Sequence, residues 1–215
     1  MSLSLPRLAL ALTLIISPAR AGEAFGDSSG TTPRLEDPLQ DEGPGNGVYG
    51  RFNGDLSLRI GVGTEVSLTS QNIRPLLVGN FIAYQTVGIY AAYREGLPSD
   101  SDFERALSLG LTFSPLFIWR WSEDLQWGSP YWDLLVDSIG ISAAIHLAQP
   151  ENGNFGQLLG AEWGLTAGFP LLGRANGLWL RTQGNIVTGK EALSGTAWLY
   201  LAWEGFFYGG LLGEH

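Results

Sequence analysis

Apolar and polar residues alternate along most of this chain with a period of two, the spacing of a β-strand. In residues 55–68, bulky apolar side chains occupy nearly every even position, whereas the odd positions carry Ser, Arg, Gly and Glu. Successive side chains of a strand point to opposite faces. The pattern therefore predicts a strand with one apolar face and one polar or small face.

The same alternation recurs further along the chain. It predicts strands over residues 76–94, 105–114, 135–148, 158–169, 178–187 and 196–208, with residues 48–52 as a short eighth candidate. Asn53-Gly54 favours a tight type I′ hairpin that would join residues 48–52 to the strand at 55–68. In the long interval between residues 115 and 133, Tyr131–Val136 is compatible with a helical turn.

The polar faces of these strands are unsuited to water. They carry mostly Gly, Ser, Ala and Thr with about one charge each, and Lys190 is the single lysine of the chain. Small residues and a few charges suit the crowded interior of a narrow barrel, so the apolar faces are expected to contact lipid. Because an unpaired buried charge is costly, we expect the interior charges to pair with one another; these are Arg59, Glu65, Glu162, Arg181 and Glu204.

Aromatic residues cluster near the ends of the predicted strands. Trp and Tyr favour the boundary between membrane and water, because the ring is apolar and its N–H or O–H reaches water. The residues expected at this boundary are Trp119, Trp121, Trp127, Trp132, Trp203 and Tyr208.

The first 46 residues differ from the rest. Residues 1–21 combine Arg7, an apolar run from Leu8 to Ser17 and the cleavage pattern Ala19-Arg20-Ala21, as a secretory signal peptide does. Residues 22–46 are rich in Gly, Pro, Ser and acids without an apolar period, which predicts a disordered acidic leader. The barrel domain is expected over residues 47–215.

Composition narrows the function classes. The chain has 215 residues, 45% of them apolar and 15% charged, with a net charge of −9; removal of Arg7 and Arg20 with the signal peptide leaves −11. The absence of Cys excludes a disulfide scaffold and a cysteine metal cluster. A net negative chain without a basic stripe is not expected to bind nucleic acid.

Candidate chemistry is sparse. His146 lies on the small-residue face of its strand, and Ser142 is four residues earlier. At about 3.3 Å per residue their Cα atoms are about 13 Å apart, too far for a nucleophile and its base. His146 is therefore expected to be an interior or rim histidine, and no catalytic residue, metal or cofactor is expected.

The signal peptide, the long alternating strands, the Gly-rich face and the aromatic residues at strand ends together resemble small bacterial outer-membrane β-barrel proteins. The resemblance spans residues 47–209, although seven residues follow the aromatic run Phe206-Phe207-Tyr208 with which such barrels commonly end. It implies a closed antiparallel up-and-down transmembrane β-barrel of about eight strands. It also implies a bilayer as the surroundings, the bacterial outer membrane as the location and termini in the periplasm.

Four functions remain open at this level. The first is a structural or surface-interaction role without catalysis, and the second is a narrow channel. The third is a lipid-modifying enzyme that would use His146 or a carboxylate with a Ser at the rim. The fourth is a secreted lipocalin-like barrel, which would turn its apolar faces inward. A multi-helix membrane protein would need several runs of about 20 apolar residues, whereas residues 75–93 form the one uncharged run of comparable length in the mature chain.

Overall fold

The structure is a computed structural model that describes residues 49–51, 53–97, 103–189 and 193–208. The expected signal peptide at residues 1–21 and the expected acidic leader at residues 22–46 lie outside these described residues. All of the described residues belong to the expected barrel domain.

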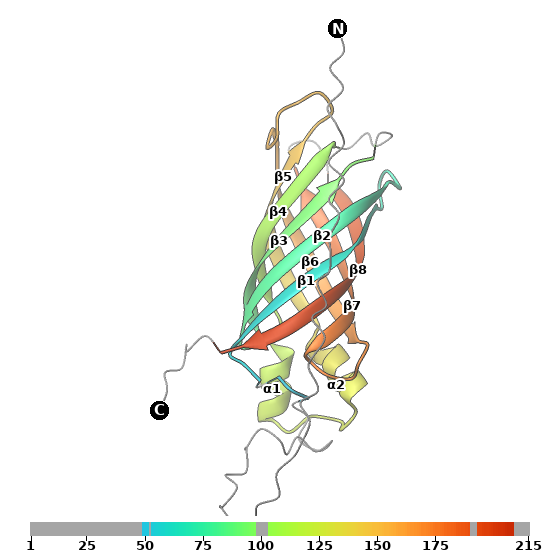
Figure 1. Cartoon of the computed structure of the whole chain (residues 1–215). Helices are drawn as coiled ribbons and strands as arrows, with labels where there is room; N and C mark the ends of the chain where they lie inside the picture. The colour runs from blue at the N-terminus through green and yellow to red at the C-terminus, as the bar shows by residue number, and fades with distance from the viewer. Residues whose placement is uncertain (1–48, 52, 98–102, 190–192, 209–215) are drawn as a thin grey trace, which may run out of the picture. The chain divides into compact units, whose positions relative to one another are not determined.

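Eight strands of the described residues form a closed antiparallel barrel (Figure 1). Each strand pairs with the next along the chain, and the last pairs with the first. The strands are β1 (Leu56–Ser67), β2 (Ile73–Ala83), β3 (Val87–Glu95), β4 (Arg105–Phe113), β5 (Gly140–Gln149), β6 (Leu158–Pro170), β7 (Gly177–Thr188) and β8 (Leu193–Phe207). The up-and-down β-barrel expected from the alternation is therefore confirmed. Closure leaves no sheet edge with unpaired backbone groups, which a lipid environment requires.

Two short helices interrupt the connection between β4 and β5. These are α1 (Leu116–Ser122) and α2 (Pro130–Asp137), and both lie at the end of the barrel where β1 begins and β8 ends (Figure 1). We call this end the helical end and the opposite one the loop end. The helical turn expected at Tyr131–Val136 is confirmed within α2, whereas α1 was not predicted. Consequently β5 starts at Gly140, five residues later than the expected strand at 135–148.

The eight strands are not the eight that the pattern predicts. Residues 76–94 form the hairpin of β2 and β3, with Tyr84 and Gln85 at its turn. Both residues have positive φ, 48° and 55°, and Thr86 N donates to Ala83 O at 3.0 Å. This is the geometry of a type I′ turn, in which Asn and Gly are the usual central residues. Because Tyr and Gln stand there instead, the sequence did not predict a turn.

The short strand expected at residues 48–52 and its Asn53-Gly54 hairpin are wrong. Tyr49–Arg51 form a turn, and Gly54 instead passes close to the end of β8. A Cβ at Gly54 would lie 2.5 Å from the carbonyl oxygen of Phe207. Glycine at this position therefore allows two backbone segments to approach closely. The pair Asn53-Gly54 nevertheless has the composition of a hairpin turn, which explains the wrong prediction.

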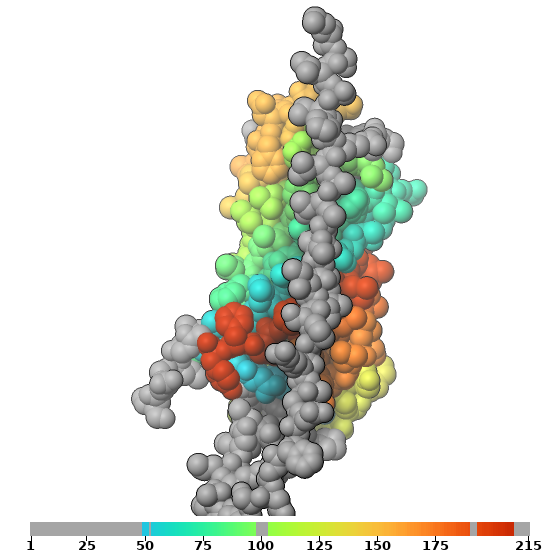
Figure 2. Space-filling model, in the orientation of Figure 1, coloured from blue at the N-terminus to red at the C-terminus, as the bar shows by residue number. Residues whose placement is uncertain are grey.

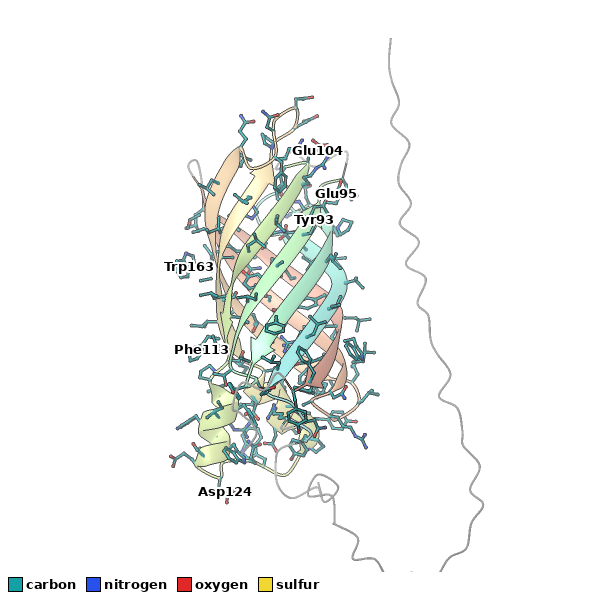
Figure 3. All side chains as sticks on the ribbon, turned by 60° about the vertical axis from the view of Figure 1, so that its left-hand side comes forward. Tyr93, Glu95, Glu104, Phe113, Asp124 and Trp163 are labelled. Atoms are coloured by element: carbon teal, nitrogen blue, oxygen red, sulfur yellow. The ribbon has the colours of Figure 1, made fainter. Side chains whose placement is uncertain are left out.

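The apolar faces point away from the barrel. Leu58, Ile60 and Leu109 are 39%, 50% and 47% exposed, whereas Arg59 and Glu162 are 8% and 0% exposed. Figure 2 shows the outer surface of the barrel from one side, and Trp163 projects outward from β6 (Figure 3). A lipocalin-like barrel needs the opposite orientation, so that alternative is wrong. In the described part of the chain, no helix has the length and apolar character needed to cross a bilayer.

A central apolar layer fills the middle of the lumen. It consists of Leu76, Val78, Tyr90, Ala92, Trp198, Tyr200 and Ala202. Small residues of β1 make room for it, because a Cβ at Gly61 would lie 2.6 Å from the ring of Tyr200. The glycines of the small-residue face therefore accommodate large rings from another strand, and the lumen is packed with side chains as expected for a barrel of eight strands.

Candidate functional site

All five charged residues expected in the interior are buried in the lumen, but they fall into two separate clusters. Arg59, Arg181 and Glu204 form the helical-end cluster, whereas Glu65 and Glu162 belong to the loop-end cluster. The two groups lie on opposite sides of the central apolar layer. Along β8 the inward positions run from Thr196 through that layer to Glu204.

The helical-end cluster is centred on one carboxylate. Arg59 donates to both oxygens of Glu204, from Nε to Oε2 at 2.9 Å and from Nη2 to Oε1 at 3.1 Å. Arg181 Nη2 donates to Oε2 at 3.1 Å, and Ser57 Oγ lies 3.4 Å from Oε1. Two guanidinium groups thus share one buried carboxylate, and bidentate geometry of this kind offsets part of the cost of removing charge from water.

Two arginines absent from the sequence prediction complete the loop-end cluster. Arg94 Nη1 lies 3.0 Å from Glu65 Oε2 and 2.9 Å from Glu162 Oε2, so that it bridges both carboxylates. Arg74 Nη1 donates to Glu65 Oε1 at 2.8 Å. Uncharged side chains give the two carboxylates further hydrogen bonds: Trp198 Nε1 donates to Glu65, and Tyr90 and Ser108 donate to Glu162.

The period-two alternation of the sequence could have identified both arginines as residues of the lumen. Even-numbered residues of β2 and β3 face the lumen, and the alternation placed Arg94 opposite the apolar face of that segment. Arg74 was missed because the predicted strand began at residue 76, whereas β2 begins at Ile73. Arg94 thus already lay on the predicted polar face, and extending the alternation by two residues towards the N-terminus would have included Arg74.

His146 joins the loop-end cluster. Its Nδ1 lies 3.1 Å from Arg94 Nη2 and 3.2 Å from Ser108 Oγ, and 3.6 Å from Glu162 Oε2. Ser142 is not its partner, since Ser142 Oγ accepts from Gln183 Nε2 at 3.2 Å. The structure therefore brings a serine to His146 from the neighbouring strand β4, a contact that spacing along one strand cannot reveal.

The Ser108–His146 contact lacks the access that catalysis requires. Ser108 is 0% exposed, and its hydroxyl donates to Glu162 Oε2 at 2.8 Å while accepting from Arg94 Nη2. A serine nucleophile must contact a substrate carbonyl and pass its proton to a base. In this arrangement the hydroxyl is fully engaged inside the ion cluster, so the contact is a structural one.

A third charged cluster closes the helical end. Arg120 of α1 donates to Asp133 Oδ1 at 2.8 Å and to Asp137 Oδ1 at 2.7 Å, both in α2. Arg51 donates to Asp137 from the chain segment before β1 and lies over the ring of Phe117, 4.3 Å from its centroid. These contacts hold both helices against the barrel. We call α1, α2 and the residues between them (116–137) the cap.

Asp133 is the most heavily bonded carboxylate of the cap. It accepts from Arg120, from Tyr49 Oη at 2.9 Å and from the backbone N–H groups of Trp127 and Ser129. Burial by itself would raise the pKa of Asp133, but the donors from Trp127, Arg120 and Tyr49 outweigh it and lower the pKa. Burial, together with its hydrogen bond to Asp133, raises the pKa of Tyr49 to about 12.

The lumen holds a large cavity at the loop end and a small one at the helical end. The loop-end cavity has a volume of about 530 Å³ and is bordered by the loop-end cluster. The helical-end cavity, of about 20 Å³, is bordered by Arg59, Arg181, Phe117 and Asp137. The two cavities share no lining residue, and the central apolar layer lies between the clusters that border them.

The six aromatic residues expected at a membrane boundary are all exposed, by 47 to 67%. Trp119 and Trp121 lie on α1, Trp132 lies on α2, and Trp127 lies between the helices. Trp203 is on the outer face of β8 and Tyr208 follows that strand. Four of the six therefore lie on the cap and not on strands, with Asp124 near its tip (Figure 3).

Comparison with known proteins yields distant structural matches. No protein-family description and no curated protein matches the sequence. The N-terminal β-barrel domain of Pseudomonas aeruginosa OprF is similar with a TM-score of 0.47 and 11% identity, over 71% of this chain and 98% of that one. The attachment invasion locus protein Ail of Yersinia pestis, solved with the heparin analogue sucrose octasulfate, is similar with a TM-score of 0.34 and 8% identity, over 70% and 96%. The likeness is one of barrel fold.

Replacement of Arg94 by Met should destabilise the barrel by about 3–5 kcal/mol, because two buried carboxylates would lose the charge that they share. Urea unfolding in lipid vesicles, followed by Trp fluorescence, measures this loss. Arg105→Met is the control, since Arg105 forms an exposed pair with Glu104 and its loss should cost about 0–1 kcal/mol. Equal losses for the two variants would contradict the assigned role of Arg94.

The cap should loosen in acid. A carboxylate whose pKa is lowered on folding contributes stability above its ordinary pKa, here 3.8, and that contribution disappears as the pH falls through the lowered value. Hydrogen exchange of peptides from residues 116–137, corrected for intrinsic rates, should accelerate as the pH falls below about 4. Asp133→Asn should exchange fast at neutral pH and show no further acid effect, while Asp124→Asn should keep the native profile. A native profile in Asp133→Asn would refute the assignment.

Proposed function

We propose that this protein is a bacterial outer-membrane β-barrel with a structural or surface-interaction role, and that it neither catalyses a reaction nor forms an open channel. The observation that carries the proposal is the filled lumen: two ion clusters, the central apolar layer between them and the cap at one end. A solute crossing the barrel would have to separate buried ion pairs and displace packed rings. Breaking a buried ion pair by itself costs about 3–5 kcal/mol.

The outer wall supports the membrane location. Its exposed side chains are bulky and apolar at alternating positions on every strand, the inverse of a water-soluble barrel. The even number of strands places the start of β1 and the end of β8 at the helical end. In an outer membrane this end would face the periplasm and the loop end would face the exterior, with export directed by residues 1–21.

The aromatic surface of the cap extends the apolar outer wall. Leu111 and Phe113 are exposed on β4, and the chain continues directly into α1 with Ile118, Trp119 and Trp121 exposed. In our proposal the cap lies in the headgroup region of the periplasmic leaflet, where Trp is favoured. Arg120, the basic residue of α1, is turned inward to the carboxylates of α2, which leaves this surface aromatic.

Spin labels test the placement of the cap and of the wall together. The sequence contains no Cys, so a cysteine introduced at any position is labelled uniquely. A nitroxide at Leu111 should contact oxygen and not a soluble nickel chelate, one at Glu151 of the loop end should show the reverse, and labels at Ile118 and Leu125 should be intermediate. If the chelate reached labels at 118 and 125 as readily as the label at 151, the placement of the cap at the interface would be contradicted. If it reached the label at 111 equally, the placement of the barrel in a membrane would be contradicted.

Conductance measurements test the closed lumen. The purified protein, shown to be folded by a heat-dependent shift in gel mobility, should give no current steps in a planar bilayer in which an established porin gives them. The expectation follows from the central apolar layer, which separates the two luminal cavities. Reproducible steps that depend on the folded protein would replace the proposal with the narrow-channel alternative.

A further inference from the structure

The loop-end cavity has the size and lining of a ligand site. Its volume of about 530 Å³ lies within the range of about 300–1,000 Å³ that small-molecule sites occupy. Residues from seven of the eight strands border it, so it lies inside the barrel mouth and not on the outer wall. The ion cluster with Glu65 and Arg94 forms part of its lining, and Trp198 donates to Glu65 from the central apolar layer.

The cavity has both apolar and polar lining. Phe103, Ala148 and Val187 contribute buried apolar surface. Leu158 and Leu193, which are 42% and 68% exposed, line the rim of the cavity where β6 and β8 begin. Ser67, Thr196 and Ser194 contribute hydroxyl groups. A mainly apolar site with a few polar groups favours a ligand with an apolar body and a localised hydrogen-bonding group.

The charges beside the cavity are already compensated. Arg74 and Arg94 balance Glu65 and Glu162, and each guanidinium forms an ion pair with at least one of these carboxylates. An ionic ligand would have to separate such a pair or remain uncompensated in a buried site, and both are costly. The lining therefore favours an uncharged ligand.

The contacts of His146 with the loop-end cluster are made by Nδ1. A guanidinium can only donate, so His146 Nδ1, 3.1 Å from Arg94 Nη2, is the acceptor. With Nδ1 as the acceptor, the ring proton is on Nε2. His146 lines the cavity, and Phe103 packs against it edge-on with ring centroids 6.1 Å apart. An acceptor oxygen on a ligand would satisfy Nε2–H.

We propose that the loop-end cavity binds an uncharged, largely apolar small molecule through a carbonyl or hydroxyl oxygen that accepts a hydrogen bond from His146 Nε2. Apolar groups of the ligand lie against Phe103 and Val187. The site depends on the closed lumen of the proposed function but not on which membrane holds the barrel. It is also independent of the Ser108–His146 contact, because that contact uses Nδ1.

The test uses a matched pair of fluorescent probes with the protein in lipid nanodiscs. Prodan is a neutral naphthalene ketone whose emission reports polarity and hydrogen bonding at its carbonyl. Its counterpart is the dimethylamino-naphthoate in which a carboxylate replaces the ketone. After subtraction of the signal from empty nanodiscs, Prodan should bind saturably with one molecule per chain, and the naphthoate should bind at least about ten-fold more weakly.

Variants on β7 localise the binding. Val187 points into the cavity, and its neighbour Ile186 points outward with 49% exposure. Val187→Phe should weaken Prodan binding by about ten-fold or more, because the added ring occupies the site, whereas Ile186→Phe should leave it unchanged. His146→Phe should weaken binding by about five-fold, the equivalent of one hydrogen bond, and should shift the emission of bound Prodan to the blue.

Each contrary outcome overturns the proposal. Prodan binding that never saturates above the empty-disc signal would remove the site. Equal or tighter binding of the naphthoate would overturn the uncharged ligand class, and equal effects of the two β7 variants would place the probe outside the cavity. Val187→Phe keeps the test decisive if His146→Phe fails to fold, which the heat-dependent gel shift detects. Conductance is measured separately, so failure here leaves the proposed function standing.

Discussion

The need to compensate charge in a closed lumen governs this structure. The interior of an eight-stranded barrel is too narrow to hydrate its ionic groups, and the outer wall offers them only lipid in the proposed setting. Each buried carboxylate is accordingly surrounded by donors. Glu204 lies between Arg59 and Arg181, and Arg94 lies between Glu65 and Glu162. These contacts link strands that are remote in sequence, so they hold the barrel closed and give each of these carboxylates a cationic partner.

The ion clusters divide the lumen into zones with different capacities. Between them the rings of Tyr90, Trp198 and Tyr200 pack where glycines of β1 leave space. Towards the helical end, the cap adds Phe117 and a further set of ion pairs. Towards the loop end the filling stops at the cluster, and a cavity begins. One barrel thus combines packed rings across its middle with a concave surface at one mouth, which is the arrangement that the proposed closed lumen and ligand site both need.

Strand number was predicted correctly through two errors that compensate. The pattern joined β2 and β3 into one segment, because Tyr84 and Gln85 keep their alternation through a turn that normally demands Asn or Gly. It also added a strand at residues 48–52, because Asn53-Gly54 has the composition of a hairpin. Gly54 serves instead the approach of backbone to Phe207. Turn geometry depends on φ, and residue type is an indirect guide to it.

The sequence alone determined which residues face inward, because a period of two ties alternate positions to opposite faces whatever the neighbouring strand is. That rule placed Arg59, Glu162 and Glu204 in the lumen and Leu58 and Leu109 on the wall. Only the tertiary structure decided which charges meet, since partners depend on the register and tilt of strands far apart in the chain. Arg94 and Glu162 are 68 positions apart, and His146 meets Ser108 across a strand boundary and not Ser142 along its own strand. A local sequence pattern cannot predict contacts between residues that are so far apart in the chain.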